Sequence, residues 1–258
     1  MRSLLVLDRP ARWTRLADLL ASLGDVTAAT TSVPTSSAAS TLATVQLPSD
    51  ASEWRSIVAD HDAIVHVGPA SRLATLVEAL SSTGAQSRVV VAAAASADEV
   101  PATEAVAERM TGAGLRVCCA RLGAWIDEDC GLVRALLPLY RCFVGLRERA
   151  DDRPMWWCHA YDVARAIVFA IQSEDMRGTF DIVTPEPARV RDLDRAISEA
   201  LDQRPVLRTT LATASRMVGE RLAQELRLGA ERTPERLSRT GFAFVFPDIR
   251  SAVADVLG

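Results

Sequence analysis

The chain has 258 residues, and its 33 acidic and 29 basic side chains give a formal net charge of −4, which argues against nucleic-acid binding through a positively charged surface. All 29 basic residues are arginine, because the sequence contains no lysine. Schiff-base chemistry, a phosphate-loop lysine and a tyrosine–lysine proton relay are therefore excluded, while the 49% of hydrophobic residues suffice for a proper core.

The first half of the chain alternates short apolar runs with segments of helical periodicity. The apolar runs predict strands at residues 3–7, 25–29, 45–47, 63–67, 88–95 and 115–122. Helical patterns lie between them at 12–23, 52–59, 71–80 and 103–111. Strands that are apolar on both faces and alternate with helices predict the α/β class, with a Rossmann-like doubly wound parallel sheet.

The second half has a different rhythm. Helices are expected at 131–144, 191–201, 212–228 and 248–257, with strands at 178–183 and 206–209. A further helix is expected to begin at Asp162, where an N-cap role is sufficient to explain the carboxylate. We therefore expect a Rossmann-like domain over residues 1–150, and a segment 151–258 that completes the sheet and adds a small C-terminal α/β substrate lobe.

Apolar runs, cysteines and histidines bear on compartment and metal binding. The longest apolar runs are far shorter than the roughly 20 residues of a membrane-spanning helix, and residues 1–7 are too short for a signal peptide. Five cysteines without a CxxC pair fit buried, reduced thiols, and three scattered histidines are too few for a zinc site. We expect a cytoplasmic protein that has no metal site and binds neither membranes nor nucleic acid.

Three segments of the C-terminal half carry a recognisable pattern. Residues 157–167 read W-C-H-A-Y-D-V-A-R-A-I, residues 178–187 read G-T-F-D-I-V-T-P-E-P, and residues 234–257 close the chain. These segments resemble the extended short-chain dehydrogenases/reductases, the NAD-dependent epimerase/dehydratase superfamily, and in particular its sugar-nucleotide-epimerase-like branch. The resemblance implies that fold, with the substrate between the carboxyl edge of the sheet and the small lobe.

The dinucleotide-binding turn departs from this family. The family has G-x-x-G-x-x-G between the first strand and helix, because bare backbone must approach the pyrophosphate. Here the three glycine positions carry Asp8, Ala11 and Thr14, and the neighbouring arginines fit a solvated basic helix start. We therefore expect no cofactor-binding residues and no cofactor, or NADP only in a non-standard mode.

The family's catalytic residues are also missing. The family uses a serine or threonine after its fourth main strand and Y-x-x-x-K on the following helix. In this chain Val100 stands at the tyrosine position and Glu104 at the lysine position, and the strand end carries alanines with Ser96 as a displaced hydroxyl. Since the chain has no lysine, a tyrosine with its pKa lowered by a neighbouring ammonium group is absent.

Candidate site residues remain near the expected strand ends. His159 suits a general base, because the reference pKa of histidine is about 6.5, or it is a structural residue of the motif. Tyr161 donates a hydrogen bond to substrate or merely covers the lobe. Trp125 and Trp157 would form an aromatic wall for a planar ligand, unless they fill the core. Arg121 would bind an anionic group of the ligand, unless it forms an internal ion pair. The residues expected to bind substrate are Ser96, Arg121, Trp125, Tyr140 and Trp157.

Three functions remain open. The leading hypothesis is a redox-independent isomerase, cyclase, dehydratase or lyase acting on a small, secondary-metabolite-like substrate, because the substrate-lobe segments are recognisable while the cofactor segments are not. The alternatives are a non-catalytic pseudoenzyme that binds a partner or ligand, and an unorthodox NADPH-dependent reductase or epimerase. We expect a small-molecule ligand, with a homodimer as one form of assembly.

Overall fold

The computed structural model describes residues 2–7, 10–30, 43–46, 51–82, 89–93, 97–150, 152–228 and 232–258. The chain forms two compact units, the first of Met1–Arg121 and Ala164–Phe180 and the second of Leu122–Val163 and Asp181–Gly258. Each unit thus consists of two chain segments. Among the helices of the described ranges, none has the length and apolar character needed to cross a membrane.

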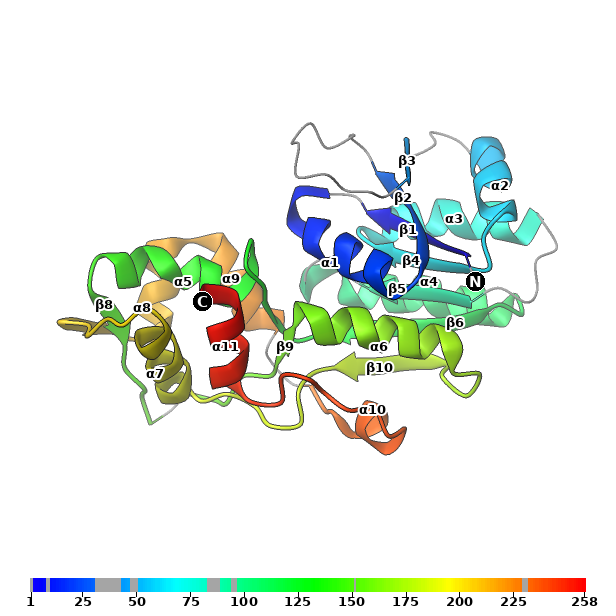
Figure 1. Cartoon of the computed structure of the whole chain (residues 1–258). Coiled ribbons are helices and arrows are strands. Elements are labelled where there is room, and N and C mark those ends of the chain that lie inside the picture. The colour runs from blue at the N-terminus through cyan, green and yellow to red at the C-terminus, as the bar shows by residue number, and fades with distance from the viewer. Residues whose placement is uncertain are drawn as a thin grey trace. The chain divides into compact units, whose positions relative to one another are not determined.

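The first unit is built on a parallel sheet (Figure 1). Its strands are β1 (Arg2–Leu7), β2 (Asp25–Thr30), β3 (Ala43–Gln46), β4 (Ala63–Val67), β5 (Val89–Ala93) and β6 (Arg116–Leu122). The spatial order is β10-β6-β5-β4-β1-β2-β3, in which β10 (Gly178–Ile182) adds a seventh strand beside β6. All neighbouring pairs from β3 to β6 are parallel. The predicted Rossmann-like parallel sheet is confirmed.

Helices cover both faces of this sheet (Figure 1). Successive side chains of a strand point to opposite faces, so each strand contributes apolar residues to the core on either side. On one face Leu4 and Ile64 are completely buried in a core shared with α2 (Ala51–Ala59), α3 (Ala70–Ser82) and α4 (Val100–Gly112), the last preceded by the short η1 (Ala97–Glu99). On the other face Leu5 lies near Leu20 of α1 (Pro10–Leu23) and Val168 of α6 (Ala160–Gln172). This two-sided cover explains why the strands read as continuous apolar runs.

The second unit has short strands and several helices. Its strands are β7 (Ala124–Ile126), β8 (Val144–Leu146), β9 (Trp157–His159) and β11 (Leu207–Thr209), and they form the two parallel pairs β7·β9 and β8·β11. Its helices are α5 (Gly131–Arg141), α7 (Val190–Ala200), α8 (Leu211–Val218), α9 (Glu220–Leu228), α10 (Glu235–Arg239) and α11 (Ile249–Leu257). Leu136 of α5, Ile197 of α7 and Leu222 of α9 meet in one buried core.

Two predicted helices of this unit differ from the observed ones. The helix expected at 131–144 ends at Arg141, since Phe143 has a φ of 58°, and the next residues form β8 instead. The helix expected at 212–228 is divided into α8 and α9 at Gly219, which has a φ of 94°. Left-handed backbone ends a right-handed helix, and apolar periodicity alone does not reveal such a break.

Candidate functional site

The carboxyl edge of the first unit's sheet is the place where ligands bind in folds of this type. The chain runs outward from β1 through β2 to β3 and then returns to β4 on the other side of β1. The strand order therefore reverses between β1 and β4. The carboxyl ends of β1, β4 and β5 are level, because Leu7 of β1 pairs with Val67 of β4, which in turn pairs with Ala93 of β5. This edge is the candidate ligand site of the unit.

The N-terminus of α1 lies at the same edge. β1 ends at Leu7 and α1 begins at Pro10, so only two residues connect them. Unpaired N–H groups at a helix N-terminus attract anions, although a proline contributes no N–H group of its own. Asp8 and the side chains of Ala11 and Thr14 lie outside the described residues, and their effect on a dinucleotide stays a prediction from the sequence.

Arg121, predicted to bind a ligand anion, has a partner inside the first unit. It lies near the end of β6, and its Nη1 atom is 3.7 Å from the Oε1 atom of Glu104 on α4. Glu104 is the residue at the family's lysine position, and Val100, at the tyrosine position, is the first residue of α4. The internal ion pair that the sequence left open is therefore present. Ser96 lies outside the described residues.

Cys119 lies on β6 in the same unit and is 2% exposed. Burial, together with the charge of Glu104, raises the pKa of its thiol to about 12. Thiolates, not thiols, are the nucleophiles of cysteine chemistry. Cys119 is consequently an inert core residue at neutral pH. The buried thiols expected from the sequence are found at Cys118, Cys119 and Cys158, whereas Cys130 is only partly buried and Cys142 is exposed.

Trp125 and Trp157, predicted to wall a ligand, are each 1% exposed. The backbone N–H of Trp125 donates a 2.8 Å hydrogen bond to Oε2 of Glu225, a fully buried carboxylate on α9. Trp157 belongs to the core that α5 and α7 share. Both indoles fill the interior of the second unit, as in the alternative that the sequence left open.

Tyr140, also predicted to contact substrate, is completely buried on α5. Its hydroxyl donates a 2.8 Å hydrogen bond to Oδ1 of Asp194 on α7. The same oxygen accepts the N–H of Leu146 at 2.7 Å, while Arg208 of β11 forms an ion pair with Oδ2. Burial, followed by the negative charge of Asp194, raises the pKa of Tyr140 far above its usual value. Tyr140 is therefore a structural hydrogen-bond donor within this unit.

His159 and Tyr161 lie together in the second unit. The Nδ1 atom of His159 accepts the backbone N–H of Tyr161 at 3.2 Å, and its Nε2 atom is 3.3 Å from Oδ2 of Asp255 on α11. The ring centroid of His159 is 3.9 Å from that of Phe246. Both ring nitrogens thus have contacts within the unit, and the imidazole is fully buried. Tyr161 is half-buried and packs edge-on against Phe246.

Asp162 does not cap a helix. α6 begins at Ala160, so Asp162 lies inside its first turn. Its two carboxylate oxygens accept the backbone N–H groups of Val245 and Phe246 at 2.8 and 2.9 Å, and its side chain is completely buried. The N-cap prediction is wrong, because the partners are more than 80 residues away along the chain, and the carboxylate fixes the segment before α11.

Other buried carboxylates escaped sequence reasoning. Asp194 is 5% exposed and connects α5, β8 and β11, and Glu225 is completely buried beside β7. Asp181 is 3% exposed and accepts the N–H of Thr233 at 3.0 Å. One signal was present for Asp194, which falls on the apolar face of its helix between Leu193 and Ile197.

Comparisons with known proteins show what the chain is similar to. No protein-family model matches it. An epimerase family protein of Mycobacterium leprae is 27% identical over 142 residues, which are 55% of this chain and 46% of that protein. One of Staphylococcus aureus is 22% identical over 154 residues, 60% of this chain and 51% of that protein. The chain spans about half the length of the curated relatives it matches.

Two solved structures share the fold over nearly their whole length. Human epimerase family protein SDR39U1, crystallised with NADPH, has a TM-score of 0.72 at 16% identity, with 100% of this chain and 99% of that chain covered. UDP-glucose 4-epimerase of Thermus thermophilus, in complex with NAD, has a TM-score of 0.67 at 15% identity, with the same coverage. At such identities the match establishes the fold.

These neighbours overturn one expectation from the sequence. The altered glycine positions led us to expect no cofactor, yet both of these proteins with this fold were crystallised with nicotinamide dinucleotides. A motif of three positions was therefore too narrow a basis for excluding the cofactor, because the strand order and the helix N-terminus also form such a site. Sequence relatives and fold together place the chain in the NAD-dependent epimerase/dehydratase superfamily, as its C-terminal segments predicted.

Proposed function

We propose that this chain binds a nicotinamide dinucleotide at the carboxyl edge of its parallel sheet and acts as a dinucleotide-dependent reductase or epimerase on a small molecule. The observation that carries the proposal is the reversal of strand order between β1 and β4, with the N-terminus of α1 at the end of β1. This arrangement is the one at which dinucleotides bind in such sheets. The neighbours crystallised with NADPH and NAD support it.

The strand order and the position of α1 fit a dinucleotide site. The sequence of the turn between β1 and α1 lacks the usual glycines, so the dinucleotide would bind in a non-standard mode. A dinucleotide at this edge would place its diphosphate near the N-terminus of α1, where Asp8 stands in the sequence instead of glycine. A carboxylate at that place opposes the diphosphate charge. We therefore expect weaker binding than a glycine-rich turn gives. When bound, the nicotinamide supplies hydride transfer.

The residues of this chain limit the acid–base chemistry. No lysine is present to lower the pKa of a tyrosine. The hydroxyl of Tyr140 is already used, because it donates a buried hydrogen bond to Asp194. The Nδ1 atom of His159 accepts the N–H of Tyr161, and its Nε2 atom lies 3.3 Å from a carboxylate oxygen of Asp255. Of the catalytic candidates named from the sequence, the half-buried Tyr161 retains a hydroxyl without a hydrogen bond among the described residues. Tyr161 therefore stays the proposed acid–base residue of the second unit, as the sequence suggested.

Titration of NADPH and NADH, followed by nicotinamide fluorescence, tests the proposal. We expect saturable binding of at least one dinucleotide. Asp8→Gly should tighten binding several-fold, because it removes a carboxylate near the diphosphate, whereas Asp175→Gly, an exposed residue in the turn after α6, should leave the affinity unchanged. Failure of both dinucleotides to bind at millimolar concentration would refute the proposal.

A non-catalytic dinucleotide-binding protein is the second candidate. It is favoured by the absence of lysine together with the buried hydrogen bond of Tyr140. A Tyr161→Phe variant distinguishes the two, once an activity on a carbonyl or sugar substrate has been found by screening with the bound dinucleotide. A fall in kcat with unchanged dinucleotide affinity supports the catalytic role of Tyr161. An unchanged kcat shows that Tyr161 is not the proton donor.

A further inference from the structure

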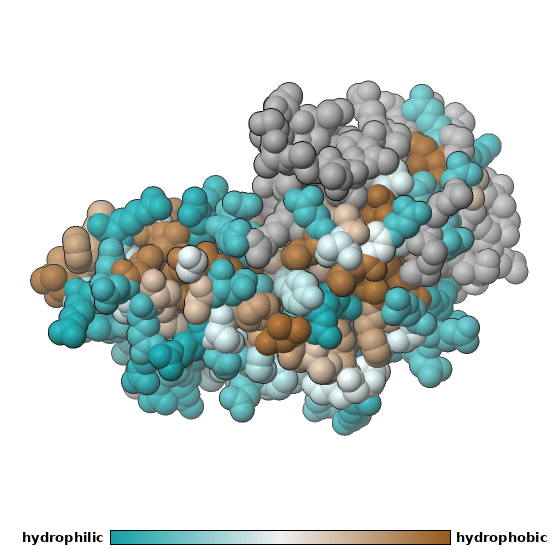
Figure 2. Space-filling model, in the orientation of Figure 1, coloured by the Kyte–Doolittle hydropathy of each residue, from teal (hydrophilic) through white to brown (hydrophobic). Residues whose placement is uncertain are grey.

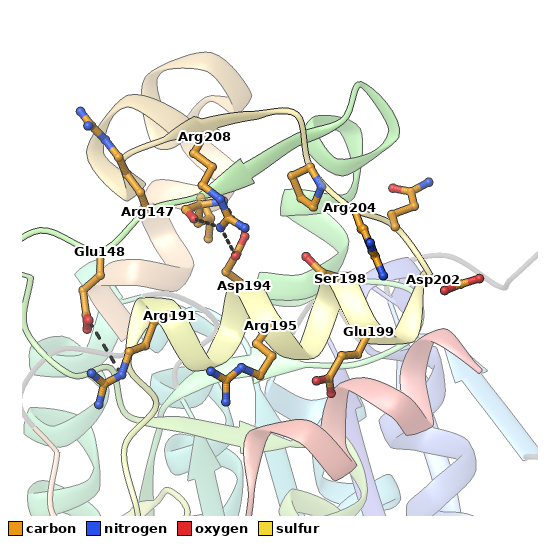
Figure 3. Close-up of a pocket in the computed structure, with 13 residues that line it drawn as sticks. Arg147, Glu148, Arg191, Asp194, Arg195, Ser198, Glu199, Asp202, Arg204 and Arg208 are labelled. Atoms are coloured by element: carbon orange, nitrogen blue, oxygen red, sulfur yellow. Dashed lines mark hydrogen bonds and ion pairs between the residues drawn. The ribbon is translucent and has the colours of Figure 1, made fainter.

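A groove of about 770 Å³ lies within the second unit, between α7, the loop 202–205, β11 and the residues after β8 (Figure 3). This size is typical of sites for small metabolites, which span roughly 300–1,000 Å³. Its lining residues are Leu146, Arg147, Glu148, Arg191, Asp194, Arg195, Ser198, Glu199, Asp202, Gln203, Arg204, Pro205 and Arg208. None of the site residues named from the sequence is among them.

Most of the carboxylates in the groove already have a cationic partner. Five arginines and four acidic residues line it. Arg208 pairs with Asp194, and Arg191 lies 4.0 Å from the carboxylate of Glu148 (Figure 3). The carboxylate of Glu199 is 2.9 Å from Arg250 of α11, outside the groove. These pairs cancel most of the negative charge of the lining.

Three arginines of the groove keep their positive charge unpaired. Arg147, Arg195 and Arg204 have no ion pair with any described residue, and the remaining lining carboxylate is Asp202. Figure 3 shows Arg195 on α7, Arg204 on the loop that follows and Arg147 beyond β8. Positive charges that line one concave surface raise its potential, which favours an anionic ligand.

Neutral polar atoms add to the binding capacity of the same wall. The Oγ atom of Ser198 and the Oε1 atom of Gln203 are buried without a hydrogen-bond partner among the described residues. Ser198 follows Arg195 by three residues on α7, so both lie on one helix face. Buried polar groups without partners are uncommon in folded proteins, and a bound ligand is one way in which they are satisfied.

The loop that carries Arg204 is held in place. Asp202 has a φ of 47°, and the N–H of Gln203 donates a 2.9 Å hydrogen bond to the carbonyl of Ser198. Pro205 packs so closely against Gly145 of β8 that a Cβ atom there would lie 2.7 Å from the proline ring. These contacts fix the backbone of the loop at Arg204 relative to α7 before any ligand binds, which lowers the entropy cost of ordering the loop.

From this geometry we propose that the groove between α7 and β11 binds a phosphorylated small molecule through Arg195 and Arg204, with Arg147 and Ser198 as further donors. The planar guanidinium group matches the oxygens of a phosphate and donates two parallel hydrogen bonds to it. The site belongs to the second unit alone, and it is independent of the dinucleotide proposed for the first unit.

Inorganic pyrophosphate is a suitable probe, titrated by calorimetry at low ionic strength. We expect saturable binding that Arg195→Ala with Arg204→Ala weakens at least about tenfold. Arg195→Lys with Arg204→Lys keeps the charge but loses the planar fork, and its affinity should fall between the two. The matched control is Arg216→Ala with Arg221→Ala, which removes two exposed arginines of α8 and α9 that have no ion pair among the described residues.

The outcomes separate this site from general charge and from the dinucleotide site. Equal weakening in the groove variant and the control variant would overturn the proposal, because net charge alone would then explain binding. Absence of pyrophosphate binding to the wild-type chain would also overturn it. The groove variant should bind NADPH as the wild type does, and a parallel loss of both ligands would show that the groove is not a separate site.

Discussion

The hydroxyl of Tyr140 and the backbone N–H of Leu146 converge on one buried oxygen, Oδ1 of Asp194, at 2.8 and 2.7 Å. Arg208 pairs with the other oxygen. This carboxylate therefore joins α5, β8, α7 and β11, and Gly145 is required beside it, because a Cβ atom there would lie 2.7 Å from Oδ1.

Removal of Asp194 should destabilise the chain more than removal of the tyrosine hydroxyl. Tyr140→Phe should lower the free energy of unfolding by about 1–2 kcal/mol, since the carboxylate keeps its other partners. Asp194→Ala should lower it by about 3–5 kcal/mol, because it leaves the hydroxyl and the Leu146 N–H buried without an acceptor. Urea denaturation measures both. The control is Asp192→Ala on the exposed side of α7, and an equal effect there would contradict the network.

Stability should fall in alkaline solution through a few identifiable groups. Burial raises the pKa of Cys119 from 9.0 to about 12 and raises that of Cys158 as well. Because the folded values are higher, the stabilisation is complete below about pH 9 and is lost as the pH rises toward the folded pKa, by about 1.4 kcal/mol per pH unit for each group. The absence of lysine leaves few other groups that titrate there.

Urea denaturation under reducing conditions between about pH 8 and pH 10.5 tests this dependence. Cys119→Ala with Cys158→Ala should flatten the alkaline slope, whereas Cys142→Ala, at an exposed position, should not. An identical slope in the double variant and the wild type would show that these thiols do not set the alkaline limit.

Asp162→Asn should loosen the segment before α11. An amide oxygen can accept the N–H of only one of Val245 and Phe246 in the observed geometry, and its NH₂ group would face the other N–H. We expect a loss of about 2–3 kcal/mol and faster hydrogen exchange of both amides. Asp175→Asn, at an exposed turn, is the control. Unchanged exchange at both amides would contradict the assignment.

We expect His159 to contribute mainly to the stability of the second unit. His159→Ala removes a buried ring that contacts Phe246, and we expect a loss of about 3–4 kcal/mol. Asp255→Ala should cost less than about 1 kcal/mol, because this carboxylate is 37% exposed. Nitrogen-15 NMR should find the proton on Nε2, since Nδ1 accepts the Tyr161 N–H. A proton on Nδ1 would invalidate this arrangement.

On the visible face of the described residues, apolar residues lie in groups between hydrophilic ones (Figure 2). Phe143, Val206 and Leu207 are notable exposed cases, and the N–H groups of the last two both donate to the carbonyl of Phe143. The carbonyl of Phe143, the residue whose left-handed backbone follows the end of α5, therefore also binds the chain at the start of β11. Neither this contact nor the strand β8 beside it was predicted, because both depend on a partner far along the chain.

The sequence by itself determined the class of fold, the superfamily and the absence of a tyrosine–lysine pair. Apolar periodicity reports which faces of strands and helices are buried, and the composition shows at once that lysine is missing. Only the tertiary structure decided that Asp162 holds Val245 and Phe246, and that Tyr140 donates to Asp194. These carboxylates resemble ordinary polar residues in a helical pattern, and their roles depend on partners brought near by folding. Charge pairing in the groove around Arg195 follows the same logic, since the sequence counts arginines while the structure shows which of them remain unpaired.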